Sequence, residues 1–184
     1  MEFAVRYGRD MREEEFNALL ALDIKVYGEG IIEAEGLALK RFLKFKDGIV
    51  SAYSDGSPAG FACFYNVDRS VYERAAAGEY IDDNLCDSEI RPFAKKRENH
   101  ILLFDLVVDE PFRNYGLGKM LFGLAGDFLR QKNEEGFTVS RIFGYSITEK
   151  GFRVMQSYGG REIWNRDGVA FFEVNKEAFM RLKQ

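Results

Sequence analysis

The stretch LVVDEPFRNYGLGKMLFGLAGDFL, residues 106–129, contains the residue types of an anion-binding turn. An apolar run ends at Pro111, Arg113 follows, and Gly116 and Gly118 precede a run with helical spacing. The first N–H groups of a helix have no intrahelical partner, and the helix dipole adds partial positive charge there. Glycines lack a Cβ atom, so a phosphate can approach their backbone closely. The stretch therefore predicts a phosphate-binding turn or, as the simpler alternative, a turn that only reverses the chain.

Two common phosphate-binding patterns do not fit this stretch. A P-loop needs a glycine five residues before its Gly-Lys pair and a serine or threonine after it, and this chain has Arg113 and Met120 at those positions. A Rossmann fingerprint needs a third glycine three residues after Gly118, where Leu121 stands. A phosphate site at this turn would therefore be of another kind.

The elements that must position this turn alternate between strands and helices. Period-two and apolar runs predict strands at residues 2–7, 100–108 and 138–145, a hairpin at 49–67, and a closing hairpin at 161–174. Helical spacing predicts helices that end near Tyr27 and Ala77, one from Glu33 to about Phe45, one that starts at the glycine turn, and one that carries Phe152 and Met155. In the first helix, the side chains expected to face the sheet are Phe16, Leu19, Leu20, Ile24 and Tyr27. This order predicts a mixed α/β domain around one sheet.

Residues 68–98 are too many for a hairpin connection between two strands. Connections of that length tend to be functional or mobile. We therefore expect residues 1–184 to form a single domain that carries a long insertion at about 68–98.

Composition and charge narrow the class of protein. Hydrophobic residues make up 46% of the chain. The net charge of −4 gives no reason to expect nucleic acid as a partner, although three basic residues cluster at Lys95, Lys96 and Arg97. The N-terminal residues contain no apolar signal region, and no run is long enough to cross a membrane. The two cysteines have no metal-ligand spacing. We expect a cytoplasmic protein that binds neither nucleic acid nor membrane.

The stretch LVVDEPFRNYGLGKML resembles the acyl-CoA-binding segment of the GNAT superfamily of N-acetyltransferases. The signature of that segment is Q/R-x-x-G-x-G/A after a strand, and Arg113, Gly116 and Gly118 match it. The order of the elements also fits the family from Phe3 to about Val174. The resemblance implies a mixed sheet of about six or seven strands with a splayed central V and helices on both faces.

The resemblance also implies an activity, which is transfer of an acetyl group from acetyl-CoA to a primary amine by direct attack in a ternary complex, without a metal. Backbone amides near the glycines would bind the CoA pyrophosphate, and the end of the preceding strand would bond the pantetheine arm. The implied CoA-binding residues are Leu106, Val107, Val108, Arg113, Asn114, Tyr115, Gly116, Leu117, Gly118 and Lys119. The alternative is a CoA-binding sensor or interaction module with this fold and little turnover.

A lysine-like amine is protonated at pH 7, so direct transfer needs a group that takes its proton. Many relatives carry a Glu-Asp pair in the central strand; Asp105 matches the aspartate, but Phe104 replaces the glutamate. Asp105 reaches the cleft only if a bulge rotates it, because neighbouring side chains of a strand point to opposite faces. His100, the one histidine, is a weaker candidate.

The proton donor to the departing thiolate is a second open position. Relatives usually present a tyrosine four residues before a glycine, and alignment on Gly159 puts Met155 in its place. Methionine has no proton to donate. Tyr158 and Tyr145 are the substitutes that lie nearby in the sequence.

The insertion contains an acidic run without a basic residue, namely Glu79, Asp82, Asp83, Asp87 and Glu89. Such runs usually form solvated surface. If this one overhangs the cleft, it would attract a cationic acceptor, either a small-molecule amine or the amine of a protein or peptide. The sequence leaves a monomer and a homodimer both open.

Overall fold

The computed structural model describes residues 2–28, 36–81 and 84–181, and its strands form one seven-stranded sheet in the order β1-β2-β3-β4-β5-β7-β6. The strands are β1 (Ala4–Tyr7), β2 (Ile49–Ser54), β3 (Ser57–Val67), β4 (Asn99–Val108), β5 (Val139–Ser146), β6 (Gly160–Arg166) and β7 (Val169–Val174). Within the described residues, β4 and β5 are parallel and the other neighbouring strands are antiparallel. The mixed sheet and its closing hairpins are as expected from the sequence.

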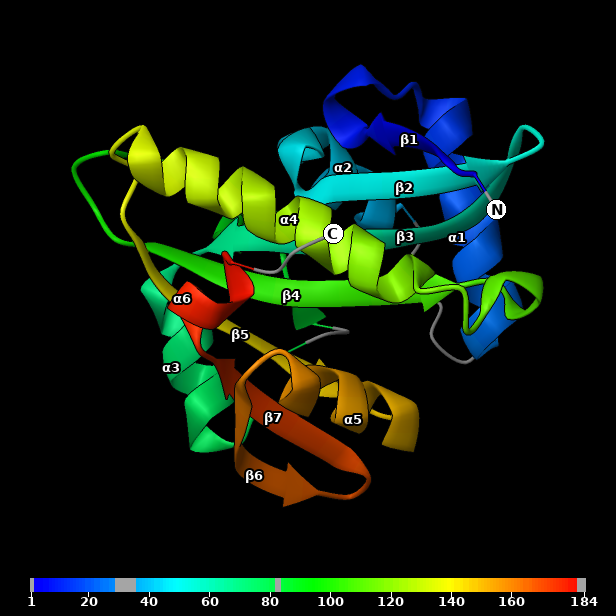
Figure 1. The fold of residues 1–184 in the computed structure, drawn as a ribbon. Helices are drawn as coiled ribbons and strands as arrows, with labels where there is room; N and C mark the ends of the chain where they lie inside the picture. The colour runs from blue at the N-terminus through cyan, green and yellow to red at the C-terminus, as the bar shows by residue number, and fades with distance from the viewer. Residues whose placement is uncertain (1, 29–35, 82–83, 182–184) are drawn as a thin grey trace.

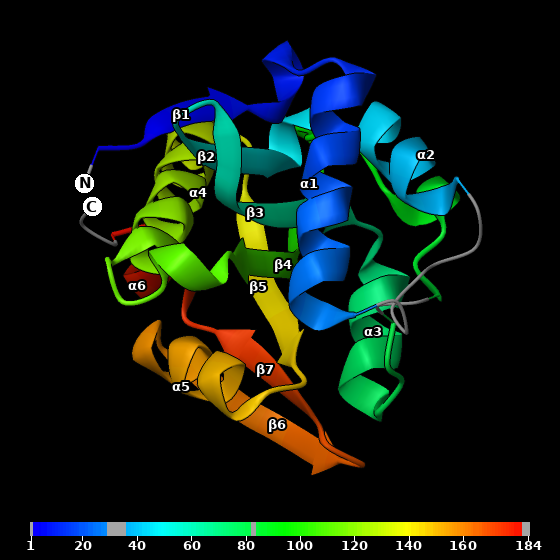
Figure 2. The ribbon, with the colours of Figure 1, turned by 90° about the vertical axis from the view of Figure 1, so that its right-hand side faces the viewer.

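Helices cover both faces of the sheet (Figures 1 and 2). The helices are α1 (Glu13–Tyr27), α2 (Leu37–Lys44), α3 (Arg69–Ala77), α4 (Leu117–Glu134), α5 (Glu149–Ser157) and the short α6 (Lys176–Phe179). In Figure 2, α1, α2 and α3 lie on one side of the strands and α4, α5 and α6 on the other. The expected start of the second helix, near Glu33, lies outside the described residues.

The sheet opens between its two central strands. β4 pairs with β5 from Asn99↔Val139 to Leu103↔Gly144, and there the pairing ends. β4 continues to Val108, still paired with β3 but no longer with β5. The C-terminal half of β4 therefore leaves β5, which is the splayed V expected from the sequence.

A β-bulge marks the point where the two strands part. On β3, Phe64 pairs with Leu103 and its neighbour Cys63 pairs with Asp105, so Phe104 is the extra residue of β4. A bulge changes the direction of the side chains on either side of it. This is the local rotation that Asp105 requires in order to reach the cleft.

The 68–98 segment is partly folded onto the body of the protein. It begins with α3, and Ile90 forms an isolated antiparallel bridge with Val67. Ile81, Leu85 and Ile90 are fully buried. Because these apolar side chains are removed from water, the segment gains stability from the same core as the sheet.

Candidate functional site

A cleft of about 550 Å³ lies where β4 and β5 part. Asp23, Val26 and Tyr27 of α1 line it on one side, and the first turns of α4 and α5 line it on the other. Figure 2 shows α1 and α4 on opposite faces of the sheet. The lining of the cleft therefore comes from both faces, next to the V. Two molecules can therefore approach the same point from opposite faces.

The glycine loop, residues 113–118, forms one end of the cleft. Gly116 is the N-cap of α4 in the left-handed conformation, with φ of 76°, and it provides no side-chain cap for the helix. Asn114 also has a positive φ, of 70°. Successive N–H groups in such a conformation form a concave anion-binding surface at the positive end of the helix dipole. The backbone conformation of the loop is therefore compatible with the phosphate-binding turn expected from the sequence.

Most of the residues expected to bind CoA line the cleft. They are Leu106, Val108, Arg113, Asn114, Gly116, Leu117, Gly118 and Lys119. Two do not: the Val107 side chain of β4 is fully buried, and the Tyr115 side chain of the loop is 61% exposed. Lys150, which the sequence reasoning did not select, also lines the cleft, so this half contains three cationic side chains and two helix N-termini.

The side chains of Arg113 and Tyr27 bond to the backbone of β4. Arg113 Nε donates to the Val108 carbonyl at 3.3 Å, and the Tyr27 hydroxyl donates to the Leu106 carbonyl at 3.0 Å. A carbonyl oxygen has two lone pairs, so Leu106 retains capacity for a second donor. These contacts hold the end of β4 in place after it has lost β5 as a neighbour.

Among the described residues, two carboxylates line the cleft, Asp105 of β4 and Asp23 of α1. Phe104 lines it as well, so both residues at the bulge face the cleft although a regular strand would separate them. Sequence reasoning missed Asp23. The sequence feature that could have identified it is a carboxylate at helical spacing from Leu19 and Tyr27, within the stripe of residues expected to face the sheet. Ile24 was placed on that stripe and is 41% exposed.

The environment of Asp23 is unusual for a carboxylate. Burial raises the pKa of Asp23 from 3.8 to about 6, because desolvation disfavours the charged form. Its Oδ1 atom is buried and finds no hydrogen-bond partner among the described residues. At neutral pH the fold therefore holds a poorly compensated negative charge in the cleft.

This charge leads to a prediction about stability. The unfolded chain releases the Asp23 proton near its ordinary pKa and the folded chain near pH 6, so the wild type loses stability as pH rises through that window. Asp23→Asn has no such loss. The free energy of unfolding of the variant, measured relative to that of the wild type, should therefore increase by about 1 kcal/mol from about pH 4 to about pH 7.5, after allowance for solvent screening. Urea denaturation at both pH values measures this difference. An equal offset at both would show that Asp23 ionises normally in the fold.

The described members of the acidic run, Glu79, Asp87 and Glu89, do not line the cleft. The Arg74 guanidinium holds two of its carboxylates, Glu89 at 2.8 Å and Glu79 at 3.6 Å. Asp82 and Asp83 lie outside the described residues. Among the described residues of the run, none lines the cleft, where the described carboxylates are Asp23 and Asp105.

The two candidate tyrosines occupy different environments. Tyr145 lines the cleft, but its hydroxyl donates to the Glu79 carbonyl at 2.8 Å. Tyr158 is not part of the cleft lining; it packs against Phe122, with ring centroids 5.2 Å apart, and burial raises its pKa. Met155 does line the cleft. The side chain at the tyrosine position of the sequence pattern is therefore apolar and faces the site.

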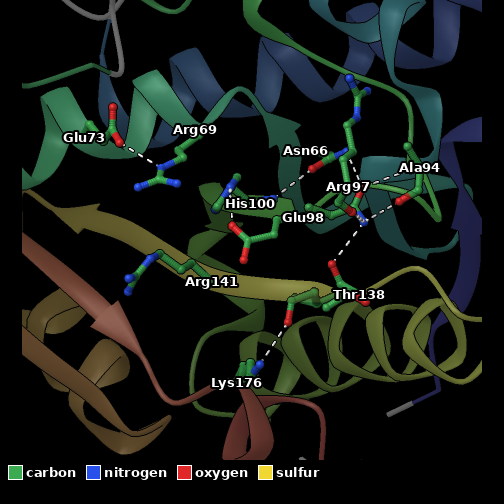
Figure 3. A network of polar contacts seen from close by, with 12 residues as sticks. Asn66, Arg69, Glu73, Ala94, Arg97, Glu98, His100, Thr138, Arg141 and Lys176 are labelled. Atoms are coloured by element: carbon green, nitrogen blue, oxygen red, sulfur yellow. Dashed lines mark hydrogen bonds and ion pairs between the residues drawn. The ribbon is translucent and has the colours of Figure 1, made fainter.

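His100 lies away from the cleft, in a separate hollow of about 260 Å³ at the start of β4. Figure 3 shows its ring beside Glu98, with 3.7 Å between Nε2 and the carboxylate. The ring is buried, and desolvation lowers its pKa. Its backbone N–H donates to the Asn66 amide at 3.1 Å. This position gives His100 no access to the residues that line the cleft.

None of the helices in residues 2–28, 36–81 and 84–181 combines the length and apolar composition of a transmembrane segment. The same residues bring together no group of three histidine, cysteine, aspartate or glutamate side chains that could hold a metal ion.

Comparisons with known proteins agree with this architecture. A sequence model of the family described as "Acetyltransferase (GNAT) family" matches residues 16–141. Curated protein sequences give no match.

Among solved structures, the loading GNATL domain of CurA from Lyngbya majuscula is similar at a TM-score of 0.68, with 12% identity over 96% of this chain and 99% of that domain. PH1933 from Pyrococcus horikoshii OT3 gives 0.63, with 17% identity over 95% and 98%. The PaiA N-acetyltransferase from Thermoplasma acidophilum, solved with coenzyme A, gives 0.58, with 13% identity over 95% and 99%. At these identities, the likeness establishes the shared fold.

Proposed function

The chain belongs to the GNAT family of acetyltransferases, and we propose that it transfers an acetyl group from acetyl-CoA to a primary amine by direct attack in a ternary complex. The observation that carries this proposal is a cleft lined from both faces of the sheet, with the glycine-rich N-terminus of α4 in one part of its described lining and the carboxylates of Asp23 and Asp105 in another. A phosphate-bearing thioester and a cationic amine are complementary to these two ends.

The glycine-loop end is suited to CoA. Free N–H groups of the loop and the first turn of α4 would bind the pyrophosphate, and Arg113, Lys119 and Lys150 add positive charge around it. Along β4, Asp105 precedes the loop by a strand segment of roughly 10 Å, which an extended pantetheine arm would follow. The family match and the coenzyme A in the solved PaiA structure support CoA as the ligand of this end.

The carboxylate end is suited to a cationic amine. Asp105 and Asp23 are the carboxylates of the cleft among the residues that the structure describes. An ammonium ion placed between them would be attracted there and could lose its proton to one of them. The neutral amine then attacks the thioester carbonyl. The C–S bond breaks, and the electron pair leaves on the sulfur of CoA. Either a small amine or the amine of a peptide fits this description.

Incubation with acetyl-CoA and a panel of amines tests the proposal. Release of the CoA thiol, together with a mass increase of one acetyl group on an acceptor, is the expected result. The rival is a CoA-binding sensor or interaction module, which is favoured by the absence of the usual glutamate and tyrosine at Phe104 and Met155. Tight CoA binding with no transfer to any amine would support that rival.

The leaving thiolate needs little assistance, since a thiol has a pKa of about 8.5. Tyr158 packs in the core, and the Tyr145 hydroxyl is directed to a backbone carbonyl. We therefore expect Tyr158→Phe and Tyr145→Phe each to lower the rate less than roughly tenfold, or about 1.4 kcal/mol. Steady-state rates at saturating acetyl-CoA measure this. If one variant abolished transfer but kept its CoA affinity, that tyrosine would be the acid.

A further inference from the structure

We infer that the Asp23 carboxylate accepts the proton that the amine acceptor must lose, an inference that rests on the amine acetylation proposed above. Asp23 enters the cleft from α1, on the opposite face of the sheet from α4 and the glycine loop. A base at this position would meet an acceptor on that side without contacting the CoA pyrophosphate. Asp105, which the sequence suggested, would then attract and orient the ammonium group.

The first reason is the position of Asp23 on its helix. Phe16 and Leu19 of α1 are buried against the sheet, and Asp23 continues the same stripe towards Tyr27. A carboxylate on the packed face of a helix costs stability, because it is partly desolvated. Its Oδ1 atom has no hydrogen-bond partner among the described residues that would offset this cost. Such locally unfavourable choices are expected at functional sites.

The second reason is that Asp23 shares a buried neighbour, the Cys63 thiol, with two other charged groups. Asp23, Asp105 and Arg41 all act electrostatically on the buried thiol of Cys63. The Tyr65 side chain is hydrogen-bonded to that thiol. Burial raises the pKa of the thiol and of the Tyr65 phenol, so both stay neutral at pH 7. The charged side chains in this set are therefore Arg41 and the two aspartates. The Arg41 Nε atom donates to the Leu85 carbonyl at 2.7 Å.

The third reason is chemical. A base works best when its pKa lies near the working pH, because it is then ionised and still a strong acceptor. The pKa of about 6 for Asp23 meets this condition. The ammonium ion transfers one proton to Asp23, and the nitrogen lone pair forms the N–C bond. As the C–S bond breaks, the electron pair goes to sulfur, and the second nitrogen proton passes to the thiolate or to water.

The test compares the pH dependence of kcat/KM for wild type, Asp23→Asn and the surface control Glu14→Gln, with an amine that the wild type acetylates. The wild type should lose activity below about pH 6. Asp23→Asn should be slower by roughly 100-fold or more at neutral pH, and should recover as pH approaches the pKa of the amine. Asp23→Glu should retain part of the activity, and formate should partly rescue Asp23→Ala. Glu14, exposed on the same helix, should be replaceable without effect.

Calorimetry with acetyl-CoA separates this inference from the proposed function. Asp23→Asn should bind acetyl-CoA as wild type does. If the wild type acetylates an amine and Asp23→Asn keeps both its rate and its acidic limb, Asp23 is not the base while the proposed function stands. If the wild type binds acetyl-CoA but acetylates no amine, the proposed function fails and the inference fails with it.

Discussion

Replacing Gly118 with valine is expected to weaken CoA binding about 30-fold, or about 2 kcal/mol. A Cβ atom on Gly118 would lie 3.6 Å from Leu106 Cδ2 and 3.7 Å from Val108 Cγ2, which are ordinary contacts. The protein itself therefore tolerates a side chain there. The branched methyl groups of valine, however, would occupy the space between the loop and β4 and would block charge-assisted hydrogen bonds to the pyrophosphate. Calorimetric titration with CoA measures the loss.

Gly118 is a cleaner position for this test than Gly116. The φ of 76° at Gly116 strains any other residue, so a loss of affinity there would combine blocked binding with distorted backbone. Gly136, beyond the far end of α4, provides the opposite control. It has a φ of 89° and open space around it, so Gly136→Ala should lower stability and leave CoA affinity unchanged. If Gly118→Val kept wild-type affinity in a folded protein, the proposed phosphate site would be wrong.

The order of the elements was predictable because each strand and helix has a strong local signal. The hairpin turns at Asp55-Gly56 and Asp167-Gly168 adopt positive φ angles, as their sequences predict. The run at 100–108 is apolar enough for a strand with neighbours on both sides, which β4 has. The buried part of the insertion was not predictable. Ile81, Leu85 and Ile90 have no regular spacing, so their burial depends on contacts that only the folded chain provides.

The two ends of the candidate site also differ in whether the sequence predicts them. The glycine loop is continuous in sequence, so the spacing of Arg113, Gly116 and Gly118 predicts it. The carboxylate end combines α1 with β4, which lie far apart in the chain, and no local pattern links Asp23 to Asp105. The apolar face of a helix is also wide enough to include neighbouring positions. Periodicity therefore predicted that Ile24 faces the sheet, whereas Ile24 is exposed and Asp23 lines the cleft.

The second large effect is expected at Asp105. Asp105→Asn keeps the shape of the side chain but removes a negative charge from the cleft, and a hydrogen bond between charged groups is worth about 2 kcal/mol. We therefore expect kcat/KM for a cationic amine to fall roughly 30-fold, mainly through a higher KM. The loss should persist from neutral pH to just below the pKa of the amine, because over that range the acceptor remains an ammonium ion. Initial rates at several pH values measure it.

An acceptor that is already neutral at the assay pH is the matched control, since it needs neither attraction by Asp105 nor removal of a proton. With such an acceptor, Asp105→Asn and Asp23→Asn should both approach the wild-type rate. The two carboxylates then differ only with cationic acceptors, where Asp23→Asn should recover at high pH before the amine is fully neutral and Asp105→Asn should not. If Asp105→Asn instead lost roughly 100-fold in kcat and recovered with rising pH, the strand carboxylate would be the base. The bulge at Phe104, which turns Asp105 into the cleft, would then have placed the base where the sequence pattern expects it.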